Sequence, residues 1–221
     1  MKKVIAALAL FVSFGAHAGW APLAAPTALT ENFDSGLGAF SPINASTDPV
    51  GSGWFPGNPG VFPAQAGAPG SYAASNFLVT NSGSIAAWLI SPELTFTGQT
   101  VSFFARTEDA TLGFLDGLTL MVSTAGASMN LGDFVPLFSI GPGALADVWT
   151  QYSAVLGSLG SGRIAFLYGV ADFDTANYVG VDTVSVTGGG TQVPEPASLA
   201  LLGLGLGLIG LARRRHRGRA R

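Results

Sequence analysis

Short segments rich in β-branched and aromatic residues follow one another from residue 31 to residue 187. Glycine, proline, asparagine or aspartate separates most of them, and none has the apolar spacing of an amphipathic helix. Many short strands with turn residues between them predict an all-β domain, either a sandwich or a barrel. We expect strands at 76–80, 87–91, 100–107, 118–124, 134–140, 149–155, 163–170 and 178–187.

A stretch rich in glycine and proline, GSGWFPGNPGVFPAQAGAPG, occupies 51–70. Because these residues oppose regular structure, we predict a long surface loop, with Trp54, Phe55 and Phe62 folding back over an edge of the core. Trp54 is also the tryptophan that we expect to offer an exposed ring for stacking on a sugar. Trp88 and Trp149 belong to strand-like segments, so we expect both to be buried.

The N-terminus has the pattern of a secretory signal peptide over 1–18. A charged start precedes an apolar run, and Ala16 and Ala18 form a cleavage site of small residues. We therefore predict an exported chain that is cut after Ala18. The remaining chain begins with a lead-in at 19–30, and the strand-rich domain covers 31–187.

The C-terminus has the pattern of a membrane anchor. A glycine-rich linker at 188–193 leads to an uncharged apolar segment at 197–212, and six arginines occur within 213–221. As a helix the apolar segment would be about 24 Å long, somewhat less than the roughly 30 Å of a bilayer core. A buried core helix would show a polar face, and this segment has none. The arginines predict that the tail stays on the cytoplasmic side.

The end of the chain resembles the PEP-CTERM sorting signal of Gram-negative bacteria. Pro194, Glu195 and Pro196 are followed by the apolar segment and the basic tail, in that order, over 194–221. The resemblance implies processing by an exosortase, which is a membrane-embedded enzyme. It also implies removal of the tail and delivery to the cell surface or extracellular matrix of a bacterium that makes exopolysaccharide.

The residues left after removal of both ends exclude several functions. The segment 19–193 keeps two arginines and all acidic residues except Glu195, so it is strongly acidic and nucleic acid is not an expected partner. It contains no cysteine, lysine or histidine, which excludes thiol, Schiff-base and serine–histidine catalysis and the usual zinc sites. Carboxylate chemistry, such as glycoside cleavage, is the catalytic class that remains.

Some acidic residues are expected to point inward. Asp116 and Asp182 precede apolar positions of their strands with a spacing of two, while Asn32 and Asp34 share one face of the first strand. A buried carboxylate needs an arginine, several N–H donors or a metal ion. Calcium bound by Asn32, Asp34 and Asp182, where the first and last strands would meet, is one hypothesis. Turn capping through backbone N–H groups is the alternative.

A second group of oxygen-bearing side chains lies between two expected strands. Asp172, Asp174 and Asn177 form a loop that could also hold calcium, although their spacing differs from that of helix–loop–helix calcium sites.

The domain also resembles the choice-of-anchor J or cleaved-adhesin family, which is MAM-like. The segments ENFDSG, WLISPEL, VSFFAR, DGLTLMVST and VGVDTVSV occur in this order within 31–187. The resemblance implies a jelly-roll sandwich of two antiparallel sheets, a non-catalytic surface or binding module, and a frequent calcium site. We therefore expect a protein of adhesion or matrix structure that acts through exopolysaccharide. The alternatives are a lectin-like carbohydrate-binding module and a glycoside-active enzyme.

Overall fold

The computed structural model describes residues 24–188, which form twelve strands and four short 3₁₀ helices. The predicted signal peptide at 1–18, the linker beyond Gly188 and the sorting signal at 194–221 lie outside these residues. Within 24–188 no helix has the length and apolar character needed to cross a membrane. The strands are β1 (Leu29–Glu31), β2 (Ser41–Asn44), β3 (Phe55–Pro56), β4 (Ala73–Asn76), β5 (Ile85–Ile90), β6 (Leu94–Phe96), β7 (Thr100–Thr107), β8 (Leu118–Ser123), β9 (Phe134–Ile140), β10 (Thr150–Val155), β11 (Gly160–Val170) and β12 (Tyr178–Thr187). The helices are η1 (Phe77–Val79), η2 (Ala110–Leu112), η3 (Leu131–Asp133) and η4 (Phe173–Thr175).

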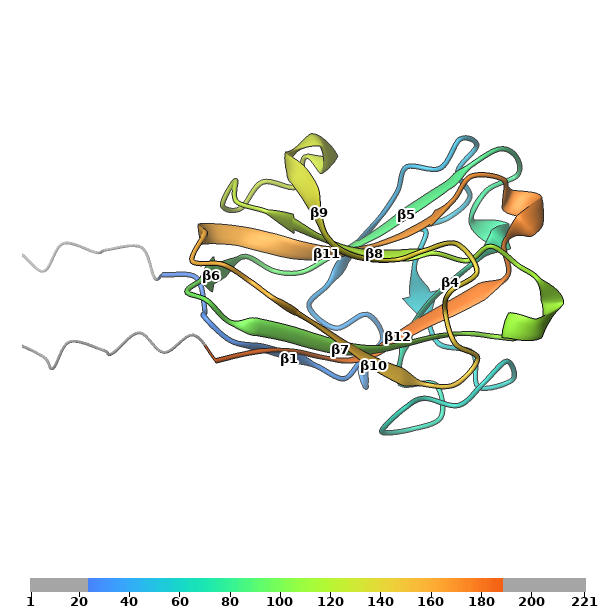
Figure 1. The fold of residues 1–221 in the computed structure, drawn as a ribbon, viewed down its shortest axis with the longest axis horizontal. Helices are drawn as coiled ribbons and strands as arrows, with labels where there is room; N and C mark the ends of the chain where they lie inside the picture. The colour runs from blue at the N-terminus through green and yellow to red at the C-terminus, as the bar shows by residue number, and fades with distance from the viewer. Residues whose placement is uncertain (1–23, 189–221) are drawn as a thin grey trace, which may run out of the picture.

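Two antiparallel sheets pack face to face (Figure 1). Sheet A has the strand order β10-β7-β12-β4-β3, and β1 also pairs with β12. Sheet B has the order β2-β5-β11-β8-β9, and β6 also pairs with β11. This two-sheet sandwich confirms the all-β, jelly-roll-type fold class predicted from the sequence.

The core lies between the sheets and follows from the alternation of side chains along each strand. In β7, Val101, Phe103 and Ala105 are buried, whereas Ser102 and Phe104 on the other face are partly exposed. Full burial of a valine or phenylalanine side chain stabilises the fold by about 1.5–3 kcal/mol. The β-branched and aromatic positions that predicted the strands are therefore the positions that build the core.

Most of the expected strands are confirmed. The predictions at 100–107, 134–140 and 178–187 coincide with β7, β9 and β12. Four others, at 87–91, 118–124, 149–155 and 163–170, match β5, β8, β10 and β11 to within a few residues. The strand expected at 76–80 is wrong, because β4 ends at Asn76 and η1 follows. The Asn76 side chain accepts a hydrogen bond from the Leu78 backbone N–H at 3.0 Å and so starts a helical turn.

The strand β12 changes its neighbour halfway along its length. Residues 178–181 pair with β4, and residues 184–186 pair with β1. The register with β7 shifts between Asp182 and Ser185, and Thr183 has a φ of 49°. A β-branched residue in this region is unusual, so the bulge is a specific feature of this strand.

The bulge inverts the alternation of side chains. Val179 and Val181 before it and Val184 and Val186 after it all enter the core between the sheets. Asp182 therefore faces the outer side of sheet A, and the expectation that it shares a face with Val184 and Val186 is wrong. One extra residue, which the alternation pattern does not reveal, accounts for the difference.

The glycine- and proline-rich stretch lies over this outer side of sheet A. Phe62 is buried there, with its ring centroid 5.0 Å from that of Tyr72 and 5.3 Å from that of Tyr178. A Cβ atom on Gly57 would lie 2.2 Å from the Tyr72 ring, so only glycine fits at that position. The prediction that Trp54 and Phe62 fold back onto the domain is confirmed by their burial.

The first and last described residues leave the sandwich at the same end, because β1 pairs with the second half of β12 (Figure 1). The helices η1, η2 and η4 gather at the opposite end, drawn in teal, light green and orange in Figure 1. The ten residues of β12 connect the two ends, a length of roughly 30 Å at 3.3 Å per residue.

Candidate ligand pocket at the loop end of the sandwich

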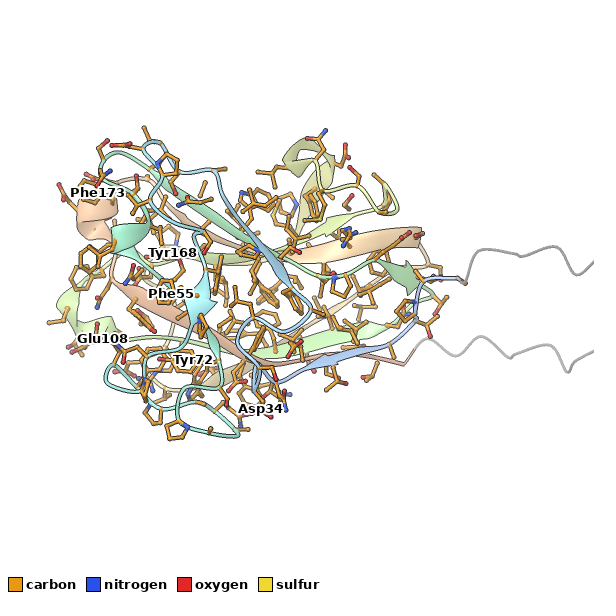
Figure 2. The ribbon with its side chains drawn as sticks, turned by 180° about the vertical axis from the view of Figure 1, so that it is seen from behind. Asp34, Phe55, Tyr72, Glu108, Tyr168 and Phe173 are labelled. Atoms are coloured by element: carbon orange, nitrogen blue, oxygen red, sulfur yellow. The ribbon has the colours of Figure 1, made fainter. Side chains whose placement is uncertain are left out.

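A pocket of about 280 Å³ opens at the end of the sandwich that carries η1 and η4. Phenylalanines from three segments of the chain supply its aromatic wall. One of them, Phe173, lies far from the ends of the described chain (Figure 2). Its volume is close to the lower limit for small-molecule pockets. The residues that line it are Phe77, Phe114, Phe173, Asp174, Ala176 and Asn177.

Backbone hydrogen bonds hold these segments together. N–H groups donate to carbonyl oxygens from Phe77 to Asn177 at 3.0 Å, from Leu115 to Thr175 at 2.7 Å and from Phe173 to Gly83 at 2.8 Å. Each bond joins parts of the chain that are distant in sequence. The pocket is therefore a product of the folded sandwich and not of one local loop.

A buried carboxylate is bonded to the backbone of a residue that lines the pocket. Asp116 is 1% exposed and accepts hydrogen bonds from the Thr107 hydroxyl at 2.7 Å, the Tyr168 hydroxyl at 2.6 Å and the Asn177 backbone N–H at 2.9 Å. Burial, and next the negative charge of Asp116, raise the pKa of the Tyr168 hydroxyl. The inward direction expected for Asp116 is confirmed, and hydroxyl and N–H donors satisfy it.

The side chain of Asn177, unlike the Asp116 carboxylate, has no hydrogen-bond partner in the described chain. The residue is only 8% exposed, yet its side-chain amide forms no hydrogen bond with any residue of 24–188. No fully buried side-chain nitrogen or oxygen in the described part of the chain lacks a partner. The Asn177 amide atoms therefore reach open space, and the space that this residue borders is the pocket.

The second oxygen-rich loop expected from the sequence coincides with part of this site. Asp172 uses its carboxylate to cap η4, accepting from the Asp174 backbone N–H at 3.2 Å, whereas Asp174 and Asn177 line the pocket. Among the described residues no three acidic, histidine or cysteine side chains gather as a metal cluster. The phenylalanines of the wall were not predicted as site residues, because they come from three segments that are distant in sequence.

The calcium hypothesis placed Asn32, Asp34 and Asp182 where the first and last strands meet. The pairing of β1 with β12 is confirmed, but β1 ends at Glu31 and Phe33 has a φ of 55°, so Asn32 and Asp34 belong to a turn. The Asn32 amide donates to the exposed Asp34 carboxylate at 2.5 Å.

Asp182 is fully buried and directs its carboxylate to hydrogen-bond donors. One oxygen accepts from the Gln65 and Ala66 backbone N–H groups at 2.9 and 3.3 Å, and the other accepts from the Thr183 N–H at 2.6 Å. A Cβ atom on Gly67 would lie 2.6 Å from an Asp34 oxygen, so Asp34 borders the same loop. Carboxylate oxygens such as those of Asp34 and Asp182 are the type of ligand that calcium prefers. The bonds that are present are those of the turn-capping alternative.

The pH dependence of stability tests the environment of Asp182. Burial raises the pKa of its carboxyl group, and the N–H donors oppose this rise. The folded state then binds the proton more tightly than the unfolded state, so this group's contribution to the free energy of unfolding decreases as pH rises from about 4 through the raised pKa. Urea denaturation with chelator present measures the free energies of unfolding of the wild type and of Asp182→Asn. The wild-type value minus the variant value should decrease as the pH rises through this range. A difference that grows with pH would contradict the assignment.

The expectation that Trp54 offers an exposed ring for a sugar is wrong. Trp54 has no exposed surface, and its indole N–H donates to the Ala87 carbonyl oxygen at 3.0 Å. The loop turns this ring inward because an indole buries a large apolar area when its N–H has a partner. Trp88 is buried as expected, whereas Trp149 is only partly buried and packs on Phe62.

Solved structures similar to this domain are cleaved adhesin domains of Lys-gingipain from Porphyromonas gingivalis W83. The K1 domain is 22% identical, with 74% of this chain and 99% of that chain covered and a TM-score of 0.58. The K3 domain is 23% identical, with 72% and 95% covered and a TM-score of 0.55. At this identity the likeness shows the fold alone, and it confirms the sandwich that the cleaved-adhesin resemblance implied.

Residues 192–217 match the family model described as the PEP-CTERM protein-sorting motif. The match confirms the resemblance based on Pro194, Glu195 and Pro196. A search of curated proteins finds no relative of this chain. The sorting motif defines an exported protein with a C-terminal anchor before cleavage, and this protein carries a β-sandwich with the fold of cleaved adhesin domains.

Proposed function

We propose that this protein is a non-catalytic carbohydrate-binding protein of the cell surface or extracellular matrix, where its sandwich adheres to exopolysaccharide. The observation that carries this proposal is the position of the pocket relative to the sorting motif. Asn177 at the pocket directly precedes β12, and the chain continues from the far end of β12 toward the motif. A protein held by its C-terminal end would therefore present the pocket away from the membrane.

The residues at the pocket support a binding role without catalysis. Glycosidases generally place two carboxyl groups about 5–10 Å apart across the bond that is cleaved. The pocket is lined by one carboxylate, that of Asp174, and Asp116 beneath it is bound to three donors. We expect no release of reducing sugar from polysaccharides. Release that disappears on a single Asp→Asn change would favour the glycoside-active alternative.

Binding to exopolysaccharide tests the proposed function. The full-length chain is kept in solution with a mild detergent. It is mixed with exopolysaccharide purified from the bacterium that makes this protein. We expect the protein to sediment with the polymer and Phe173→Ala to reduce the bound fraction. Val155→Ala is the control, since Val155 is 69% exposed and lies at the end of β10 paired with Thr100, away from the pocket. No sedimentation with or without calcium would refute the function.

The proposal includes export through a signal peptide, exosortase processing with removal of the tail, and delivery to the cell surface or extracellular matrix. It is supported by the sequence pattern at 1–18 and by the sorting motif at 192–217. We expect the mature extracellular protein to lack residues 1–18 and to end near Pro194-Glu195-Pro196. Intact mass spectrometry of the extracellular fraction measures both losses. Recovery of the full-length chain from the cytoplasm alone would contradict this prediction.

Calcium beside Asp34 and Asp182 remains a separate proposal, supported by the oxygen donors that border the loop at 65–67. An ion that binds only the folded state stabilises it by about 2.7 kcal/mol at one hundred times its Kd, a rise of roughly 5–11 °C in melting midpoint. We expect Asp182→Asn to remove most of this rise. Equal midpoints in chelator and in millimolar calcium would leave turn capping as the role of these residues.

A further inference from the structure

Asn177 is 8% exposed, and its side-chain amide reaches the pocket without a hydrogen-bond partner among residues 24–188. Such an amide is free to form hydrogen bonds with a ligand that enters the pocket and displaces water there. Its backbone is meanwhile fixed on both sides, through the N–H to Asp116 and through the C=O to Phe77. The backbone of Asn177 is thus held in place at the pocket, which this residue lines.

The charges around the pocket select against anionic ligands. Asp174 lines the pocket and Asp172 caps the same loop. The two arginines of the described chain are engaged elsewhere, with Arg106 lying 4.2 Å from the Phe62 ring centroid and Arg163 bonded to the Ser91 and Ala127 carbonyl oxygens. Since no cation lines the pocket, a carboxylate, sulfate or phosphate group would meet the negative charge of Asp174 and gain no cationic partner.

We propose that the pocket binds one neutral pyranose unit of a polysaccharide, with Asn177 as the residue that selects it. The C–H face of a pyranose ring is apolar and packs on aromatic rings, which Phe77, Phe114 and Phe173 provide. Two neighbouring hydroxyl groups present a donor beside an acceptor, which is the complement of a carboxamide. The Asp174 carboxylate can accept a hydrogen bond from a further hydroxyl group, and a volume of about 280 Å³ suits one small ligand rather than a long chain segment.

This inference rests on the proposed function and specifies its ligand. The test measures binding of the full-length chain in detergent to neutral β-1,4-linked gluco-, galacto- and xylo-oligosaccharides and to anionic oligogalacturonate. We expect at least one neutral probe to bind, and oligogalacturonate to bind at least tenfold more weakly. Asn177→Leu should weaken binding of the neutral probe by about tenfold, as expected for lost hydrogen bonds. Phe173→Ala should do the same, and Val155→Ala should leave binding unchanged.

The stability of Asn177→Leu separates a binding role from a structural role. Leucine has a similar size and keeps the backbone bonds, so the melting midpoint should stay the same or rise while binding falls. A midpoint lowered by several degrees would show that the amide supports the fold, and the inference would fail. Exopolysaccharide binding that the pocket variants leave unchanged would overturn the inference while the proposed function stands. If the wild type binds neither exopolysaccharide nor any probe, both fail.

Discussion

Asp116→Ala should lower the free energy of unfolding by about 3–5 kcal/mol, because each of two buried donors left without an acceptor costs about 1–3 kcal/mol. The change leaves the Tyr168 hydroxyl and the Asn177 N–H without their acceptor, while the Thr107 hydroxyl keeps a longer contact of 3.2 Å with the Tyr178 carbonyl oxygen. Tyr168 lies well inside the domain, as Figure 2 shows, so water does not readily replace the carboxylate. The melting midpoint should fall by roughly 6–20 °C.

Asp116→Asn is the matched control for this change. Its carbonyl oxygen can still accept from Tyr168 and Asn177, so it loses only the acceptor for Thr107. We expect its loss of stability in urea denaturation to be less than half of that of Asp116→Ala. A loss below about 1 kcal/mol for Asp116→Ala would mean that the network contributes little to folding. Because Asp116 holds the Asn177 backbone, carbohydrate binding should also weaken in any Asp116→Ala protein that remains folded.

Trp54→Ala should destabilise the domain by about 3–5 kcal/mol, the usual cost of removing a large aromatic side chain from a core. Trp54 has no exposed surface and belongs to the main core between the sheets. Its removal leaves a cavity and also frees the Ala87 carbonyl oxygen, which accepts the indole N–H at 3.0 Å.

Trp54→Phe separates these two contributions, since it retains most of the apolar volume and loses only the N–H donor and one ring. It should cost clearly less than Trp54→Ala in the same urea denaturation. Phe77→Ala serves as the surface control, because Phe77 is 40% exposed. If Trp54→Ala and Phe77→Ala have equal effects, the burial of Trp54 does not determine the stability of the fold.

The strands were largely predictable, because the apolar alternation that builds the core is local. Thr100–Thr107 is an example, since its alternating positions enter the core as the sequence predicts. The shortest strands were missed, such as Phe55–Pro56 in the glycine- and proline-rich stretch. Such a strand exists only because β4 pairs with it, and no pattern within two residues can show this.

The candidate sites were less predictable than the fold. The alternation pattern placed Asp182 on the wrong face, because the bulge at Thr183 depends on contacts with Gln65 and on the change of neighbour along β12. The pocket could not be predicted from the sequence either, since Phe77, Phe114 and Phe173 belong to three distant segments that only the folded sandwich brings together. The polar residues Asp174 and Asn177 were singled out from the sequence, but for a metal ion rather than a pocket.

The course of β12 has a mechanical consequence. A force applied between a ligand at the pocket and the C-terminal attachment would pull along this strand, which lies in the interior of sheet A between β7 on one side and β4 and β1 on the other. Tension parallel to a strand loads its cross-strand hydrogen bonds together in shear, whereas tension across a hairpin opens them one after another. If the proposed function is right, tension between a bound polymer and the C-terminal attachment would therefore load β12 in shear along both of its edges.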